Sequence, residues 1–317
     1  MKLQTIIPLK KQSKNLIDYH SNILLLGSCF VENMGATLSY FKFQTLQNPF
    51  GILFQPKAIE TFVANVISQK TYSENDIFFH NEQWHCFDAH SRLSASSKEH
   101  LLTELNNQIK STNQQISKAT HIIITLGTAW VYRFLESNQV VANCHKVPQN
   151  QFKKELLSVE EIAQSLQTMA QLIQSVNPKA SIIFTVSPVR HTKDGFVENT
   201  LSKAHLITAI HQVIPSLGAR VLYFPSFEMM MDELRDYRFY AEDMLHPNAT
   251  AIQYIWEKFQ YVWFSEAASK TMEAVGAIQK GLQHKPFNPN SEAHQQFLQN
   301  LKAQINRLCS QFPHISF

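Results

Sequence analysis

Short apolar segments that end at a glycine, serine or proline alternate along this chain with longer amphipathic segments, and this alternation limits its fold more than any other feature. Aliphatic and β-branched runs bounded by turn residues are typical of buried parallel strands. We expect such strands at residues 22–26, 121–126, 181–186 and 220–224. Apolar residues at helical spacing predict helices over 31–41, 158–175, 199–214 and 248–263. The order predicts an α/β, three-layer fold whose mostly parallel central sheet is covered on both faces.

Two segments fall outside the alternation. Residues 73–94 are rich in aromatic residues and histidine, which favours a hairpin or an ordered insertion. Beyond Ser265 the chain is polar and rich in glutamine, with helical patches at 269–282 and 292–312. We therefore expect a main domain over residues 1–265 and a helical C-terminal extension over residues 266–317.

Composition and charge exclude several classes of protein. With 317 residues, 44% of them hydrophobic, the chain can bury a large core without disulfides or metal ions. Its net charge is +3 and no basic stripe is present, so no nucleic-acid partner is expected. No apolar stretch of about 18 residues predicts a membrane span. The first 14 residues carry four lysines and too short an apolar run for a secretory signal, and a cytoplasmic location is expected.

The four cysteines have no short paired spacing, which favours free thiols over a zinc ribbon or a disulfide framework. Asp88 and His90 together with His145 have the residue types of a metal site, but their spacing is not compact. We expect neither a metal nor another cofactor.

Two segments carry candidate chemistry. Ser28 follows a strand-ending glycine at the start of a helix, where a hydroxyl lies at the rim of an open sheet and can act as a nucleophile. The adjacent Cys29 is a rival nucleophile, because a helix start also favours a thiolate. Far along the chain, Asp243 and His246 form an Asp-x-x-His loop in which the carboxylate can orient the imidazole. In the alternative interpretation, Asp243 is a helix cap and His246 a surface residue.

The strand-terminal serine and the late Asp-x-x-His-Pro resemble the SGNH, or GDSL-like, hydrolase superfamily. Residues 26–31, Leu-Gly-Ser-Cys-Phe-Val, are more closely similar to the signature of the GSCFA family, with Val31 in place of its alanine. Further segments that resemble this family are residues 48–51, 87–91, 125–129, 143–146, 185–191 and 232–240. This resemblance implies a flavodoxin-like fold and a triad of Ser28, Asp243 and His246.

The resemblance also implies an oxyanion hole made from three blocks of sequence. The amides of Ser28 and Gly51 match the first two blocks. The third departs from the Gly-x-Asn pattern of the superfamily, because Gly127 is followed by Thr128 and Ala129. We expect Thr128, or else Asn143, to replace the missing asparagine as donor.

Other polar residues have open roles. Arg190 and His191 follow a strand end and are expected to bind an anionic or polyol group, unless Arg190 pairs with Asp194 or Glu198. The Arg-Asp-Tyr-Arg segment at 235–238 faces the substrate or forms a structural ion-pair network. The candidate triad and the family resemblance together predict an esterase or O-acyltransferase that acts on an O-acylated carbohydrate or lipid. The alternative is a non-catalytic ligand-binding module on the same fold.

Overall fold

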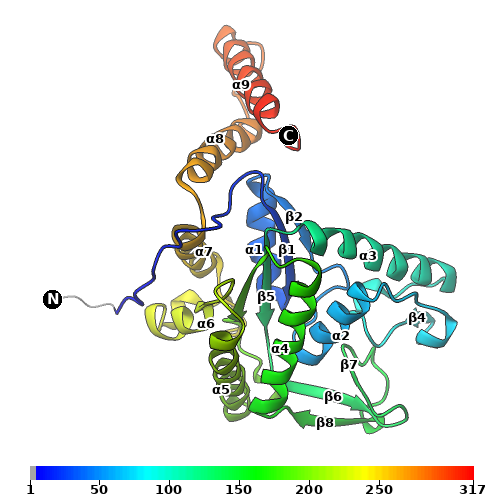
Figure 1. Ribbon diagram of the computed structural model, residues 1–317. Helices are drawn as coiled ribbons and strands as arrows, with labels where there is room; N and C mark the ends of the chain where they lie inside the picture. Colours follow the sequence, from blue (N-terminus) through cyan, green and yellow to red (C-terminus); the bar gives the residue numbers. More distant parts are fainter. Residues whose placement is uncertain (1–4) are drawn as a thin grey trace.

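A central sheet of parallel strands organises the computed structural model, which describes residues 5–317 (Figure 1). The first four residues of the expected main domain lie outside this described part. The five strands are ordered β10-β9-β5-β1-β2. Their bounds are β1, Asn22–Gly27; β2, Gln44–Gln47; β5, His121–Leu126; β9, Ser181–Val186; and β10, Val221–Phe224. Counted along the chain this is the flavodoxin-like order 2-1-3-4-5, so the order reverses between β1 and β5.

Helices cover both faces of the sheet, as the alternation predicted. Their bounds are α1, Cys29–Tyr40; α2, Pro56–Ile67; α3, Lys98–Lys118; α4, Val159–Val176; α5, Phe196–Val213; and α7, Ala249–Trp263. Short helical turns occur at 74–76, 91–93, 149–151, 192–194, 214–216, 226–233 (including α6, Ser226–Glu228) and 237–239. The α/β fold class is confirmed.

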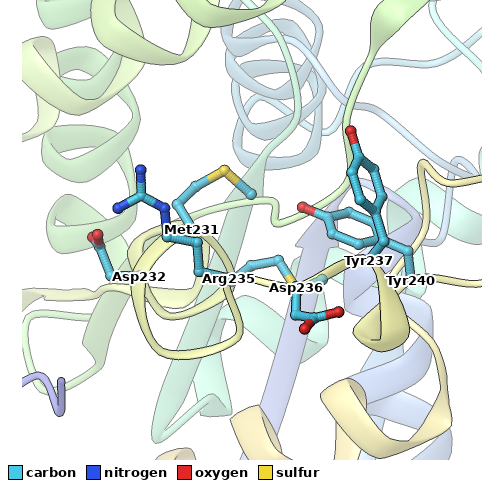
Figure 2. Close-up of a pocket in the computed structure, with 7 residues that line it drawn as sticks. Met231, Asp232, Arg235, Asp236, Tyr237 and Tyr240 are labelled. Carbon is cyan, nitrogen blue, oxygen red and sulfur yellow. The ribbon is translucent and has the colours of Figure 1, made fainter. Parts of the chain in front are cut away.

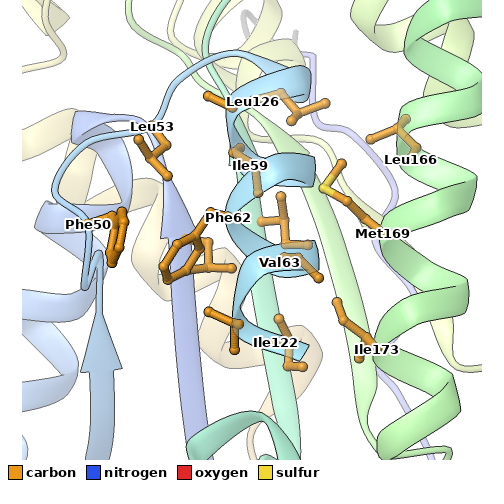
Figure 3. Packing of buried hydrophobic residues seen from close by; sticks show 14 of the residues in the cluster. Phe50, Leu53, Ile59, Phe62, Val63, Ile122, Leu126, Leu166, Met169 and Ile173 are labelled. Atoms are coloured by element: carbon orange, nitrogen blue, oxygen red, sulfur yellow. The ribbon is translucent and has the colours of Figure 1, made fainter. Parts of the chain in front are cut away.

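Two separate hydrophobic clusters lie on the two faces. One joins α2 and α4 to the sheet through residues such as Phe62, Met169 and Ile122, which Figure 3 shows interdigitating. The other joins α1 and α7 to the opposite face through Val31, Trp256 and Ile23. Because side chains of a strand alternate between faces, Leu24 and Leu26 belong to the first cluster, and Ile23 and Leu25 to the second.

The protein also contains two smaller antiparallel sheets. The sequence predicted a hairpin or an ordered insertion at 73–94 for the first, and it did not predict the second. That hairpin is β3, Phe78–His80, paired with β4, Gln83–His85. The other sheet contains β6, Trp130–Phe134; β7, Gln139–Val141; and β8, Phe152–Leu156, in the order β7-β6-β8. It forms within the connection from β5 to α4, so it lies beyond the carboxyl end of β5 (Figure 1).

Two long helices form the C-terminal extension: α8, Glu266–Gln283, and α9, Glu292–Gln311. They project from the opposite end of the molecule from β6 and β8 (Figure 1). The Gln279 amide donates to the Tyr40 carbonyl at 3.0 Å, and the rings of Phe312 and Tyr19 are 5.1 Å apart. The extension therefore packs at the amino ends of the strands. Among the helices of the described residues, none is both long and apolar enough to cross a membrane.

Candidate functional site

The candidate residues gather at the carboxyl ends of β1, β5 and β9, beside the reversal of strand order. Gly27 ends β1 with φ +130°, and a Cβ there would lie 2.1 Å from the Thr125 carbonyl oxygen of β5. Only glycine permits both this backbone conformation and this close approach. The glycine therefore brings the start of α1 directly against the end of β5.

Asp243 and His246 form a hydrogen-bonded pair in the loop before α7. His246 Nδ1 lies 2.6 Å from Asp243 Oδ2, and the N–H groups of His246 and Leu245 donate to Asp243 Oδ1. These hydrogen bonds, chiefly the two from backbone N–H groups, hold the pKa of the Asp243 carboxyl at about 2. Asp243 does not cap α7, because the Asn248 side chain accepts the Ala251 N–H there. The aspartate is thus free to fix the imidazole, so that Nε2 is the nitrogen left to act.

His246 Nε2 faces Cys29 and not Ser28. The distance from Nε2 to Cys29 Sγ is 3.8 Å, a long hydrogen-bond contact for sulfur. Ser28 is fully buried, and its Oγ has no hydrogen-bond partner among the described residues. The expected hydrogen bond between Ser28 and His246 is therefore absent, and the neighbouring thiol occupies that position.

The start of α1 lies at this difference of one residue, because Ser28 is the N-cap of the helix and Cys29 is its first residue. Ile23 and Leu25 face α1 and α7, and the loop with His246 enters α7. The side chain of Cys29 reaches His246 at the start of the helix, whereas that of Ser28 is enclosed. The adjacent serine and cysteine were visible in the sequence, but which of them meets the loop before α7 was not.

The Cys29 thiol lies half-buried at the N-terminus of α1, where some neighbouring groups raise its pKa and others lower it. The N–H groups of Cys29 and Phe30 point at the sulfur, as unpaired donors of a first helical turn do. Burial, with a smaller contribution from Glu32, nevertheless raises the pKa of the thiol, and Lys203 only partly offsets this. The resting group is therefore a thiol, whose proton must be removed during any attack.

The two backbone donors predicted for the oxyanion hole already have partners. The Ser28 N–H donates to the Thr125 carbonyl at 3.0 Å, which continues the pairing of β1 with β5. The Gly51 N–H donates to the Asn48 carbonyl at 2.7 Å and closes a tight turn. Gly51 also has φ +74°, and a Cβ there would lie 2.4 Å from that of His90. A bulky residue at Gly51 would strain this turn, so its effect would not isolate an oxyanion role.

The predicted substitutes for the missing asparagine are engaged as well. Thr128 Oγ1 accepts the Trp130 N–H and lies 3.0 Å from Ser202 Oγ in a buried network. Asn143 Oδ1 accepts the His145 N–H at 2.8 Å and lines a different hollow, beside β6 and β7. In the described part of the chain, neither side chain hydrogen-bonds to Cys29 or His246.

Arg190 and His191, in the loop after β9, lie beside the loop of Asp243 and His246. The Arg190 N–H donates to the Leu245 carbonyl at 3.1 Å, and its guanidinium lies over the rings of Phe196 and Tyr240. Asp194, an alternative partner for Arg190, instead pairs with Lys154. Burial lowers the pKa of His191 to about 3, so its imidazole is neutral.

Two functional candidates received no role in the sequence analysis, although Asn48 lies in the family-like segment 48–51. Lys203 in α5 is 1% exposed, and its Nζ donates to the carbonyls of Gly127 at 2.7 Å and Ser187 at 2.8 Å. Burial lowers the pKa of this ammonium to about 7. Asn48 accepts the Gly27 N–H with its Oδ1, while its buried Nδ2 has no partner in the described structure. A lysine within a helix and an asparagine in a turn both have common structural explanations, so neither gave a signal.

The segment around Arg235 lines a separate hollow of about 400 Å³. Figure 2 shows the Arg235 guanidinium near Asp232 on one side and the phenols of Tyr237 and Tyr240 on the other. Arg238 lies 3.8 Å from the exposed Asp236, whose Oδ1 also accepts the Arg238 N–H. Tyr240 links this segment to Arg190.

The residues considered for a metal site are dispersed among other contacts. Asp88 accepts the Tyr72 hydroxyl at 2.9 Å, and His145 Nε2 contacts the Cys86 carbonyl. His90 packs beside Gly51. Within residues 5–317, no group of three or more histidine, cysteine, aspartate or glutamate side chains is arranged to hold a metal ion. All four cysteines are free thiols.

Comparison with protein families identifies the chain. The model of the GSCFA family matches residues 22–259, from β1 through most of α7. The chain belongs to the GSCFA family. A second model, the C-terminal domain of GSCFA domain proteins, matches residues 275–317, which include all of α9 and the second half of α8. Among curated proteins, none matches this GSCFA chain.

One solved structure with a similar arrangement is an acetyl xylan esterase, Est2A, from the rumen bacterium Butyrivibrio proteoclasticus. It is 11% identical to this chain, with a TM-score of 0.38. The match covers 84% of this chain and 66% of the esterase, slightly less than two thirds of its length.

Proposed function

We propose that this GSCFA protein transfers acyl groups through Cys29, with His246 as general base and Asp243 as the residue that orients it. The observation that carries the proposal is the 3.8 Å contact from His246 Nε2 to Cys29 Sγ, combined with the 2.6 Å contact from Nδ1 to Asp243. A nucleophile, a base and an orienting carboxylate in this sequence of contacts form a catalytic triad. The proposal moves the nucleophile from Ser28 to its neighbour.

The reaction begins with loss of the thiol proton. His246 Nε2 takes this proton as the sulfur attacks the acyl carbon of an ester, and the new bond joins sulfur to carbon. Collapse of the tetrahedral intermediate breaks the bond to the alcohol oxygen, which leaves with the proton from His246. Water or a second alcohol then attacks the thioester carbon while His246 takes its proton. The carbon–sulfur bond breaks, the acid or the new ester leaves, and the sulfur regains the proton from His246 as the thiol.

Backbone amides at the start of α1 are the proposed donors to the oxyanion. The N–H groups of Cys29 and Phe30 already point toward the sulfur, and the positive end of the helix dipole adds to their effect. The unpartnered Nδ2 of Asn48 is our candidate for the amide donor that the Gly127-Thr128-Ala129 segment lacks. The substrate class that we propose is an O-acylated carbohydrate or lipid.

Trapping the acyl-enzyme tests the proposal. Purified protein is mixed with p-nitrophenyl acetate, quenched in acid and digested, and the peptides are analysed by mass spectrometry. We expect an acetyl group on Cys29 in the wild type and in Ser28→Ala, and none in Cys29→Ala. An adduct on Ser28 that survives Cys29→Ala would contradict the proposal in favour of the serine. Absence of any adduct and of any ester turnover would favour a ligand-binding module.

A further inference from the structure

A second hollow lies between the end of the main sheet and the β7-β6-β8 sheet. Its volume is about 300 Å³, at the small end of the range for ligand pockets. Phe54 and Gln55, which precede α2, form one wall, and Trp130 of β6 forms another. The segment 141–146 after β7 closes it. Its lining, as far as the structure describes it, does not include Cys29, Asp243 or His246.

Gln55 is the first sign that this hollow binds something. Its side chain is 2% exposed, yet neither Oε1 nor Nε2 has a hydrogen-bond partner within the described chain. It occupies the N-cap position of α2 without making a capping hydrogen bond. A buried amide that leaves both its donor and its acceptor unused costs stability, and apolar residues of similar shape are available. An unpaired amide on a residue that lines a hollow is suited to a polar ligand.

His145 supplies a second unused group on the same hollow. It is 4% exposed, and its Nε2 lies 2.7 Å from the Cys86 carbonyl, so Nε2 carries the proton. Nδ1 is then an acceptor, and it has no partner among the described residues. Burial lowers the pKa of this imidazole to about 4, which keeps it neutral. The group is therefore prepared to accept a hydrogen bond from a hydroxyl.

The rim of the hollow is positively charged. Lys146 and Lys193 line it, and no acidic side chain belongs to the lining that the structure describes. Lys146 follows His145 in a left-handed turn, with φ values of 61° and 49°, and Asn143 Oδ1 fixes this turn by accepting the His145 N–H. A cleft lined by charge of one sign attracts ligands of the other.

We propose that this hollow binds an anionic polyol, a sugar-sized molecule that carries a carboxylate or a phosphate. Its hydroxyls bind the Gln55 amide and His145 Nδ1, and its anionic group binds Lys146 and Lys193. Phe54 and Trp130 provide flat surfaces for the apolar faces of the ring. Lys193 and His191 lie in one loop, and the His191 ring is 6.1 Å from that of Phe54, so the hollow borders the candidate active site. The further statement that this molecule is the alcohol part of the substrate rests on the proposed acyl transfer.

Equilibrium binding to the full chain tests the proposal without requiring turnover. Titration calorimetry with D-glucuronate and with glucose 6-phosphate separates a carboxylate from a phosphate ligand, and glucose reports the contribution of the charge. We expect one of the charged sugars to bind at least about tenfold more tightly than glucose, as loss of a charged contact predicts. Gln55→Met and Lys193→Ala should each weaken that binding about tenfold. Lys153→Ala, at an exposed lysine of β8 outside the hollow, should leave it unchanged.

A stability measurement separates loss of a ligand contact from loss of folding. Gln55→Met conserves volume and removes a buried unpaired amide, so we expect its Tm to equal or exceed that of the wild type. Cys29→Ala should bind the charged sugar as the wild type does, so a failed acyl-transfer proposal would leave this result intact. Equal binding of the sugar to wild type, Gln55→Met and Lys193→Ala would overturn the assignment, and so would absence of binding by both charged sugars.

Discussion

The candidate site has an exposed layer and a buried layer, which meet at two adjacent residues of one turn. In the exposed layer, Asp243 and His246 keep 45% and 49% of their side-chain surface, and they hold Cys29 at contact distance. In the buried layer, Asn48 binds the end of β1 and Lys203 binds the turns after β5 and β9. Ser28 lies enclosed beside them. Hydrogen bonds within one loop hold the exposed layer in place, and the strands themselves hold the buried layer. The difference indicates that chemistry and positioning are divided between neighbouring residues.

Substitution of the two neighbours should separate the layers most sharply. We expect Cys29→Ala to lower kcat/KM for an activated ester by about 10³-fold or more, since a triad nucleophile cannot be replaced by its partners. Ser28→Ala should change it by less than about threefold, because its hydroxyl contacts neither His246 nor an amide. Steady-state kinetics with p-nitrophenyl acetate compares the two. The reverse ranking would place the chemistry in the buried layer.

Within the exposed layer, Asp243→Asn should have the next largest effect. In a buried triad the same change costs about 10⁴-fold in kcat, because the imidazole loses its orientation. Since Asp243 is half-exposed, we expect about 10²-fold to 10³-fold here. Asp236→Asn is the matched control, because Asp236 caps a neighbouring turn without contacting His246. Equal kcat values for the two variants would remove Asp243 from the mechanism.

Asn48 tests whether the buried layer also contributes to catalysis. Asn48→Asp keeps an acceptor for the Gly27 N–H and replaces the Nδ2 donor with a carboxylate oxygen, so it both removes the proposed oxyanion contact and adds charge that opposes the oxyanion. We expect kcat to fall about 100-fold with little change in KM, as for loss of one oxyanion donor. Thr128→Val is the comparison, because its hydroxyl is committed to Ser202 and Trp130. An unchanged kcat in Asn48→Asp would confine Asn48 to positioning β1.

The smallest expected effect concerns Lys203 and stability. Its pKa is about 7 in the folded protein, whereas an unfolded lysine has a pKa of about 10.4. Between these values the unfolded chain binds more protons, so this lysine makes the free energy of unfolding rise with pH. Its unfavourable contribution is fully present below pH 7 and is relieved toward pH 10.

Lys203→Met should therefore flatten this pH dependence. The substitution also leaves the carbonyls of Gly127 and Ser187 without their donor, which costs about 2 kcal/mol at any pH. Urea unfolding at several pH values, in a Cys29→Ala background to remove the nearby thiol, measures both effects. Lys153→Met, at an exposed position, is the control. Parallel pH profiles for wild type and Lys203→Met would show that Lys203 is charged in the folded protein throughout the range.

The sequence predicted the fold best where strands are buried on both faces. β5 and β9 have the expected bounds because their continuous apolar runs leave no other interpretation. β2 was missed because its four residues, Gln-Thr-Leu-Gln, lie half-buried at the sheet edge. The β6, β7 and β8 strands were missed because their faces are only partly apolar and their pairing depends on contacts across the chain.

The candidate site was predictable only where its parts are close in sequence. Asp243 and His246 are three residues apart, so one loop determines their contact. The choice between Ser28 and Cys29 depended on where the loop before α7 places His246 relative to the start of α1, more than 200 residues earlier. The engagement of Thr128 with Ser202, and of Gly51 with Asn48, likewise follows from folding over many residues. No sequence motif marks Gln55. Only its buried side-chain amide, which has no hydrogen-bond partner in the described structure, distinguishes it.

The β7-β6-β8 sheet gives the chain a segment that can change independently of its chemistry. The chain leaves the central sheet after Gly127 and reaches α4 at Ser158, whose capping box with Glu161 begins the helix. Everything between these two points lies outside the strands that position Cys29, while its β6 and β7 residues line the hollow beside the site. Family members could therefore acquire different ligands by insertion, deletion or exchange of this one crossover. In a chimaera that swaps residues 129–157 between two such proteins, ligand preference should travel with the segment and the acylated cysteine should stay with the host.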